Sequence, residues 1–389
     1  MTPAPTEPLA AARLRTNPAY EVVVADRLTG DEADLFRSLA GGGDLFGLLR
    51  PDRAGLSYKA VDAETALLLF TLATPGPLPS FARAKLGPDC DRVVADLVLS
   101  GVLEVEGEGG FRSGPDAEPA LFARPATAGR GRTGQLSLAA LRYGQRLGAL
   151  EPSELASRLY AFNRAPLTPA WQRRLPGPDA VLDHLGLGPG GRLQPRLTAA
   201  WAAHGPDRGW LSWSSRAVRA AAEPGALTYK LYLSPTLEAL PELVEAWVAA
   251  SPRLRAFSFK LGLDAAGLLR PDKCVAYFAT LDDLARAGDV LSAAMQGLPA
   301  QGVPFTAGIT ADGLLSWGVD PPRRGTGRSW RLWVAEHAAR SLAAAAARPA
   351  AAGGTEPWLF ALRRLQVAGV DTDTWQPTGA WRADVLEGE

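Results

Sequence analysis

Three lysines lie in or beside short β-rich runs in the second half of the chain, and their side chains are the most promising chemical groups in it. An uncharged lysine amine can remove a proton from carbon, whereas the charged ammonium form binds phosphate. Lysine is scarce in this chain, in which arginine supplies most of the positive charge. The three residues are Lys230 in TYKLYLS, Lys260 in FSFKLG and Lys273 in RPDKCVAY.

Strand geometry predicts which side chains accompany these lysines. Residues two apart in a strand point to the same face, so Lys230 shares a face with Tyr232, and Lys273 shares one with Tyr277. If these faces converge, they form a lysine-rich pocket. For any single lysine the alternative is an ordinary surface residue whose ammonium group lies in water.

Several arginines are candidates for binding an anion next to the lysines. Arg270 directly precedes the third lysine run, and a second group follows the turn at Asp320. The second group is either a mobile basic loop or a lid that closes over a phosphorylated peptide. Asp320 itself is more typical of a cap than of catalysis. The phosphate- or substrate-binding candidates are Arg270, Lys273, Tyr277, Arg323, Arg324 and Arg331.

At these residues the sequence resembles bacterial type III effectors related to the phosphothreonine lyases, and the effector-like lyases of class V lanthipeptide and thioamitide gene clusters. The resemblance covers about one third of the chain, from Leu227 to Leu342. Its strongest parts are YKLYLS, FKLG, RPDKCVAYF, GVPFT and GLLSWGVDPP.

The resemblance implies an elimination of phosphate without a cofactor. In these lyases a strand lysine is the general base, and a Lys-x-His motif on an earlier strand holds the phosphate and supplies the acid. Lys260 matches the base and Lys230 the first lysine of the motif, but Tyr232 stands where the family has histidine. The resemblance therefore gives Lys260, Lys230 and Tyr232 as catalytic candidates and leaves the acid open.

Composition limits the other possible functions. The 41 basic and 41 acidic residues balance, so no overall charge would draw the protein to nucleic acid or to a membrane. Two distant cysteines and three separated histidines predict neither a disulfide framework nor a metal site. The first residues show no signal peptide, and no apolar run reaches the ~18 residues of a membrane span. We therefore expect a cytoplasmic protein.

The order of predicted elements indicates an α+β fold in three regions. Residues 1–122 carry three helical segments followed by two strands, an order typical of a winged helix, and residues 135–222 read as helical. Residues 223–389 alternate short strands with helices and predict an α+β lyase-like domain with a mostly antiparallel sheet. A basic segment, 123–134, reads as a linker, and the tail after the alanine-rich helix that ends near residue 352 reads as irregular.

The winged-helix-like region has two interpretations, a DNA reader or a peptide-docking module. Its third helix, Asp91–Ser100, carries one arginine and two aspartates, which disfavours DNA binding. A wing edge can instead add a strand from an extended peptide. We expect this region to dock the leader of a precursor peptide.

The leading hypothesis is a carbon–oxygen lyase that converts phosphoserine or phosphothreonine of a precursor peptide to dehydroalanine or dehydrobutyrine. The sequence contains neither a Walker-type phosphate loop nor HRD and DFG triplets, so a separate kinase would install the phosphate. The alternatives are a non-catalytic scaffold that binds a phosphopeptide or its kinase, and a DNA-binding regulator.

Overall fold

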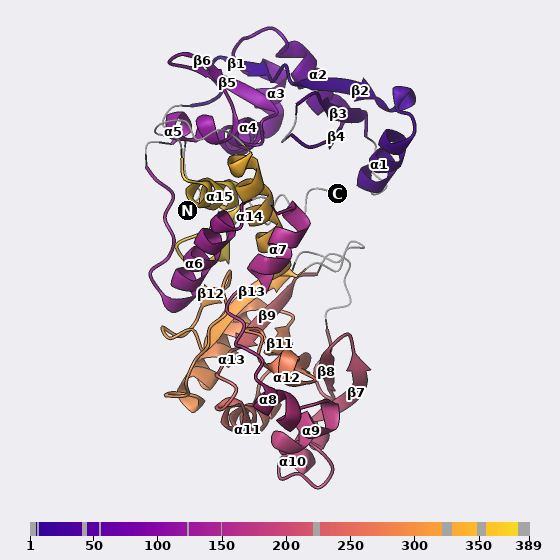
Figure 1. Cartoon of the computed structure of the whole chain (residues 1–389), viewed down its shortest axis with the longest axis vertical. Coiled ribbons are helices and arrows are strands. Elements are labelled where there is room, and N and C mark those ends of the chain that lie inside the picture. The colour runs from indigo at the N-terminus through magenta and orange to yellow at the C-terminus, as the bar shows by residue number, and fades with distance from the viewer. Residues whose placement is uncertain are drawn as a thin grey trace.

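The computed structural model describes most of the chain. The described residues are 5, 8–40, 45–53, 56–122, 124–148, 150–220, 226–320, 329–347 and 355–379. Figure 1 shows an elongated molecule in which the N-terminal part and the large sheet lie at opposite ends, with helices between them.

The N-terminal part contains two small antiparallel sheets and several short helices. One sheet has the order β2-β3-β4 and the other β1-β5-β6. Three helices followed by the hairpin β5–β6 reproduce the predicted order, although the winged-helix assignment itself stays a prediction. The elements are β1 (Leu14–Thr16), β2 (Tyr20–Val24), α1 (Asp31–Ala40), β3 (Gly47–Pro51), β4 (Lys59–Val61), α2 (Ala63–Thr71), α3 (Ser80–Leu86), α4 (Cys90–Leu99), β5 (Leu103–Gly107), β6 (Gly110–Arg112) and α5 (Glu118–Leu121).

Four helices from distant parts of the sequence form the middle of the molecule. They are α6 (Arg132–Arg146), α7 (Pro152–Tyr160), α14 (Trp330–Ala346) and α15 (Pro357–Val367). Two predictions are wrong here. The described part of the expected linker is packed, because the Gly129 amide donates to the Thr372 carbonyl at 3.0 Å and α6 begins at Arg132. The tail is not irregular, since it forms α15 and the short pair β14 (Val370–Asp371) and β15 (Gln376–Pro377).

A seven-stranded antiparallel sheet dominates the second half and confirms the predicted α+β fold. Its order is β12-β13-β9-β11-β10-β8-β7. The strands are β7 (Trp201–Asp207), β8 (Trp210–Ser215), β9 (Thr228–Leu233), β10 (Ser258–Gly262), β11 (Cys274–Phe278), β12 (Ala307–Gly308) and β13 (Leu315–Asp320). Its helices are α8 (Pro169–Arg174), α9 (Pro178–His184), α10 (Gln194–Ala200), α11 (Leu240–Ala250), α12 (Ala265–Leu268) and α13 (Leu281–Ala294). Strands β7 and β8 precede residue 223, so the sheet continues across that predicted regional boundary.

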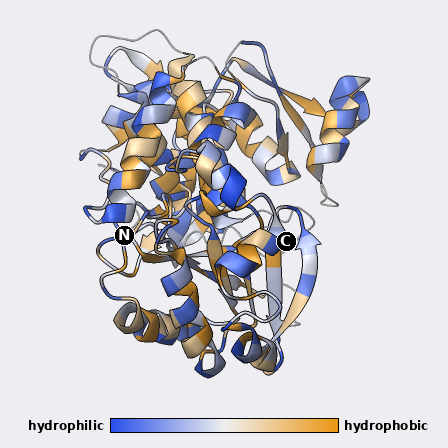
Figure 2. Ribbon diagram, turned by 60° about the horizontal axis from the view of Figure 1, so that its bottom comes forward, coloured by the Kyte–Doolittle hydropathy of each residue, from blue (hydrophilic) through white to orange (hydrophobic). Residues whose placement is uncertain are grey.

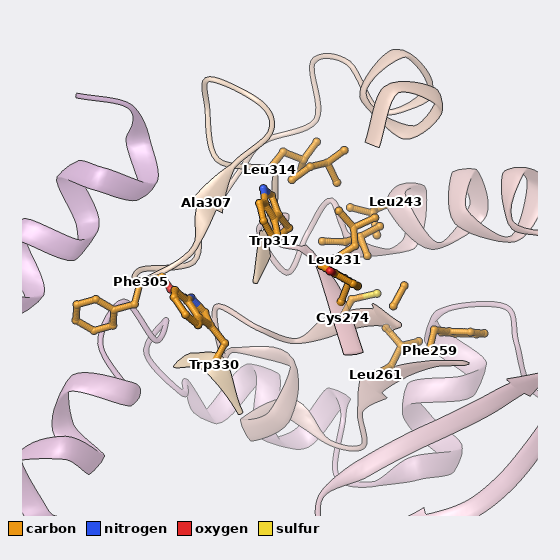
Figure 3. Packing of buried hydrophobic residues seen from close by; sticks show 14 of the residues in the cluster. Leu231, Leu243, Phe259, Leu261, Cys274, Phe305, Ala307, Leu314, Trp317 and Trp330 are labelled. Atoms are coloured by element: carbon orange, nitrogen blue, oxygen red, sulfur yellow. The ribbon is translucent and has the colours of Figure 1, made fainter. Parts of the chain in front are cut away.

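One face of this sheet is apolar because the strands alternate. Leu231, Phe259 and Leu261 are almost fully buried on this face, and Figure 3 shows them packed with Leu243 of α11. The Phe259 ring stacks on the Trp213 ring at a centroid distance of 4.7 Å. The opposite face of the same strands therefore carries the polar residues. Figure 2 shows apolar segments in both halves of the molecule, in keeping with separate hydrophobic clusters for the sheet and the N-terminal part.

A buried ion pair ties the N-terminal part to the last helix. Glu118 of α5 and Arg363 of α15 are 7% and 3% exposed, and Arg363 Nε lies 2.9 Å from Glu118 Oε1. The second carboxylate oxygen accepts from the Thr355 hydroxyl at 3.0 Å. The Arg363 guanidinium also stacks over the Phe122 ring. Removal of either charge would leave the other buried without a counter-ion.

We predict that Glu118→Ala lowers the free energy of unfolding by about 3–5 kcal/mol, because the buried Arg363 guanidinium would lose its counter-charge. Chemical denaturation measures this loss. Glu106→Ala is the matched control, since Glu106 pairs with Arg13 at an exposed site and should cost at most about 1 kcal/mol. Equal losses in the two variants would contradict the role given to the buried pair.

Candidate functional site

The sheet register brings two of the three predicted lysines, Lys230 and Lys260, onto one polar face. Lys230 of β9 pairs with Tyr277 of β11, and Tyr232 pairs with Val275. On the other side of β11, Lys260 of β10 pairs with the same Val275. Directly paired residues share a face, so these side chains all lie opposite the apolar core. The register thus unites three separate sequence runs, as the strand pattern predicts.

Lys260 lies between two aromatic rings without a counter-ion. Its Nζ is 3.9 Å from the centre of the Trp210 ring and 5.7 Å from that of Tyr277. No described residue forms a hydrogen bond or ion pair with this amine. Burial, and then the neighbouring Lys230 charge, lower the pKa of Lys260 to about 8. Lys260 therefore loses its proton more readily than an ordinary lysine does, and no hydrogen bond to a described residue holds its amine in the charged form.

Lys230 is fixed by a carboxylate. Its Nζ lies 2.5 Å from Asp320 Oδ2, and both side chains are largely buried. The other oxygen of Asp320 accepts from the backbone amide of Trp330 at 3.0 Å, at the start of α14. Asp320 thus has the structural role expected from sequence and also holds Lys230, a pairing that the sequence did not reveal.

A second fixed charge centre surrounds Asp272. Arg270 donates to both of its carboxylate oxygens at 2.9 and 3.0 Å, and the Tyr160 hydroxyl donates to Oδ2 at 3.0 Å. Arg331 Nη1 lies 2.8 Å from the same oxygen, although it is not aligned for a hydrogen bond. Burial alone would raise the pKa of Asp272, but Arg331 and then Arg270 hold it below its usual range. This carboxylate stays ionised.

Trp210 connects the two charge centres. The Arg270 guanidinium lies 4.7 Å from the Trp210 ring centre, on the ring that also contacts Lys260. Tyr160 stacks beneath Arg331 at 4.6 Å. We call Lys230, Lys260, Arg270, Asp272 and Asp320, with the Tyr160 and Trp210 side chains that contact them, the lysine–arginine cluster. Its cations outnumber its carboxylates, so it is suited to bind an anion.

Tyr232 is a buried member of the same face. It is 2% exposed and packs with Val275, Val303 and Tyr277. Burial, and then the Asp320 charge, raise the pKa of Tyr232 well above its usual value. The phenol therefore remains protonated at neutral pH and can donate a hydrogen bond, but it is a weak proton donor.

The other predicted site residues are placed differently. The ammonium group of Lys273 is fully buried and donates to the Pro235 carbonyl at 2.7 Å and to the Gln301 side chain. Arg331 is also fully buried, and it donates to the carbonyls of Pro304 and Tyr160. In this arrangement both side chains hold neighbouring segments of the chain in place. The Lys273 amine and the Arg331 guanidinium are both too buried to contact a phosphate. Arg323 and Arg324 lie outside the described residues.

Two members of the cluster come from outside the region that sequence reasoning examined for chemistry. Tyr160 ends α7, more than a hundred positions before Asp272, and no local pattern marks it. Trp210 opens β8 and is one of eleven tryptophans in the sequence. The alternation in its run WLSW is the local signal for a strand there.

The described residues contain no group of three histidine, cysteine or acidic side chains placed to hold a metal ion. Within the same residues, no helix is both long and apolar enough to cross a lipid bilayer. The cluster itself offers an amine with a lowered pKa next to fixed cations, which suits proton abstraction and anion binding.

Comparisons with known proteins give distant structural similarities. No family model matches the sequence, and no characterised relative matches it at the sequence level. An effector protein from Pseudomonas syringae pv. syringae strain 61 is 14% identical, with a TM-score of 0.40, and the match covers 64% of this chain and 99% of that one. An effector protein from Pseudomonas syringae pv. tomato strain DC3000 gives 14% identity, a TM-score of 0.37, and coverage of 62% and 97%.

A third solved structure is the phosphothreonine lyase effector VirA (SpvC) of Chromobacterium violaceum. It is 13% identical, with a TM-score of 0.27, and the match covers 37% of this chain and 77% of that one. Similarities at this level do not establish a shared activity.

We predict that Asp272→Asn destabilises the protein by about 3–5 kcal/mol at neutral pH, because it removes the counter-charge of buried Arg331. Because the native pKa of Asp272 is lowered, its contribution is present above the unfolded value of about 4 and is lost as pH falls below it. In urea titrations from about pH 5 to about pH 2, the free energies of unfolding of the wild type and of Asp272→Asn should converge.

Asp207→Asn is the control for this titration, because the Asp207 side chain is 80% exposed. Its free energy of unfolding should equal that of the wild type at each pH. A difference in unfolding free energy between the wild type and Asp272→Asn that stays constant with pH would contradict an ionised carboxylate that is stabilised by the two arginines.

Proposed function

We propose that the protein is a carbon–oxygen lyase that eliminates phosphate from phosphoserine or phosphothreonine in a peptide. The observation that carries this proposal is the environment of Lys260. Its amine lies between Trp210 and Tyr277, has no counter-ion among the described residues, and neighbours Lys230 and Arg270. A base that can remove a proton from carbon thus lies next to cations that can bind a leaving phosphate.

Lys260 is suited to act as the general base. At pH 7 a pKa of about 8 leaves about a tenth of the amine uncharged, whereas the ordinary value of about 10.4 leaves less than about a thousandth. The uncharged Nζ takes the Cα proton of the phosphorylated residue. The electrons of the Cα–H bond form the Cα=Cβ double bond, and the Cβ–O bond breaks with its electron pair on the departing phosphate.

Lys230 and Arg270 are suited to hold that phosphate. Asp320 and Asp272 fix their positions, so they need not reorganise when charge develops on the leaving group. Charge-assisted hydrogen bonds from both cations would stabilise the departing dianion. With this assistance the phosphate can leave without a strong acid, so Tyr232 need only donate a hydrogen bond in place of the family's histidine.

The finer proposal concerns the substrate. We propose a ribosomally made precursor peptide, as in lanthipeptide-type biosynthesis, with dehydroalanine or dehydrobutyrine as the product. A separate serine/threonine kinase would phosphorylate it in the cytoplasm, and the N-terminal region would dock the leader. The support for this proposal is the sequence resemblance, together with the separation of a small β-rich N-terminal part from the cluster.

The alternative is a scaffold that binds a phosphopeptide without reaction. The pairing of Lys230 with Asp320 and of Arg270 with Asp272 favours this alternative, because it reduces the net positive charge that faces a substrate. Lys260 distinguishes the two functions. A scaffold requires only its charge, whereas a lyase requires its deprotonation.

We predict that the wild type removes about 98 Da, the mass of phosphoric acid, from a phosphoserine or phosphothreonine peptide, as detected by mass spectrometry. Lys260→Ala should abolish the loss. Lys260→Arg should abolish it too, because a guanidinium keeps the charge but does not deprotonate. Lys85→Arg, an exposed lysine in the N-terminal part, should react like the wild type.

Fluorescence anisotropy with the same labelled phosphopeptide separates the outcomes. Retained binding by Lys260→Arg without elimination supports the lyase. Binding by the wild type without any mass loss would establish the scaffold instead, and elimination by Lys260→Arg would exclude Lys260 as the base.

A further inference from the structure

A large cavity lies away from the lysine–arginine cluster, where the N-terminal part meets the central helices. Its volume is about 920 Å³. Strand β4 and the end of α4 form its N-terminal side, while α14 and α15 form the other side. Figure 1 labels these four elements. This volume falls in the range of small-molecule sites, and such sites are frequent where two parts of a protein meet.

Cations from three separate elements line this cavity. They are Lys59 of β4, Arg340 of α14 and Arg364 of α15. Within the described part of the chain, Glu151 is the one carboxylate among the lining residues. Arg364 already pairs with Asp96 at 2.7 Å, whereas Lys59 pairs with no acidic residue that the structure describes.

Lys59 is the key residue because its ammonium group has no direct partner in the described part of the chain. It forms no ion pair or hydrogen bond with any residue that the structure describes. Burial, and then the neighbouring Arg364 charge, lower the pKa of Lys59. A bound anion would relieve this repulsion. A half-buried lysine that faces two arginines is unfavourable by itself, so the arrangement favours an anionic occupant.

His337 adds no charge to the cavity at neutral pH. Burial, and then Arg340, lower the pKa of His337 to about 4, and its Nδ1 lies 2.9 Å from the Trp333 carbonyl oxygen. The remaining wall is largely apolar and includes Leu56, Leu99 and Phe360. Alanines of α14 continue this surface. The cavity thus combines one cationic end with an apolar body.

We infer that this cavity is a binding site for an organic anion, with a carboxylate or phosphate held by Lys59 and Arg340 and an apolar body against Phe360 and α14. This inference is independent of the lyase proposal, because none of these residues belongs to the lysine–arginine cluster. Carboxylates and phosphates both accept charge-assisted hydrogen bonds from lysine and arginine. An experiment must therefore decide which of the two head groups the cavity prefers.

Isothermal titration calorimetry of the full chain with hexanoate, hexyl phosphate and the neutral hexanamide tests the site. The three probes share a six-carbon body and differ in charge. At least one anion should bind at least about ten-fold more tightly than hexanamide, and its affinity should fall as salt is added. The tighter of the two anions identifies the preferred head group.

Two variants locate the binding. Lys59→Met should weaken binding of the preferred anion by at least about ten-fold, and Arg340→Met, at an exposed position, provides a second test if the first variant does not fold. Lys85→Met, an exposed position of α3 that does not line the cavity, is the matched control and should bind the preferred anion like the wild type. Equal binding of hexanamide and the anions, no binding of any probe, or unchanged binding by folded Lys59→Met and Arg340→Met would each overturn the inference.

A measurement of elimination activity shows whether the cavity site and the lyase proposal fail independently. Lys59→Met should process a phosphopeptide like the wild type in the mass-spectrometric assay. A failure of anion binding with intact elimination would therefore overturn the cavity site alone.

Discussion

The buried carboxylate of Asp272 is the constraint on which the site depends. It accepts hydrogen bonds from Arg270 and Tyr160 and lies against the buried Arg331, so it joins the sheet to α7 and to the first turn of α14. A buried carboxylate is unfavourable unless its hydrogen bonds and charge are satisfied. Here the partners come from three elements, so the sheet and the central helices must assemble together before the charges balance. The positions of Arg270 and Trp210, and through them the surroundings of Lys260, follow from that assembly.

The arrangement also explains how one face can hold several cations without losing its base. Lys230 and Arg270 each pair with a carboxylate, whereas among the described residues Lys260 contacts aromatic rings and no carboxylate. Burial lowers the pKa of Lys260 most, and the positive charges of Lys230 and Arg270 lower it further. Had Lys260 been given its own carboxylate, it would remain protonated and would serve only to bind. The division between paired and unpaired cations is therefore the physical basis of the proposed lyase.

Sequence reasoning predicted what strand alternation can predict. The faces of Lys230 and Tyr232 follow from a period of two, and the composition of β9, β10 and β11 marked them as strands. It missed β7, whose run WAAHGPD contains glycine and proline, and it missed α15 in the tail. It also took Lys273 for a phosphate ligand, because sequence does not show that Pro235 and Gln301 occupy its ammonium group. Tyr160 lies 112 positions from Asp272, a tertiary contact that no local pattern encodes.

The titration of the five lysine side chains, followed by NMR with carbon-13 at the ε position, tests the central claim most directly. Comparison with Lys260→Arg assigns the resonance of Lys260, and the pKa of an ordinary lysine, about 10.4, is the reference value. The account predicts a midpoint for Lys260 near 8, which moves upward in Lys230→Met when the neighbouring cation is removed. A Lys260 midpoint at the ordinary lysine value would contradict it, since such an amine would be almost entirely charged at neutral pH.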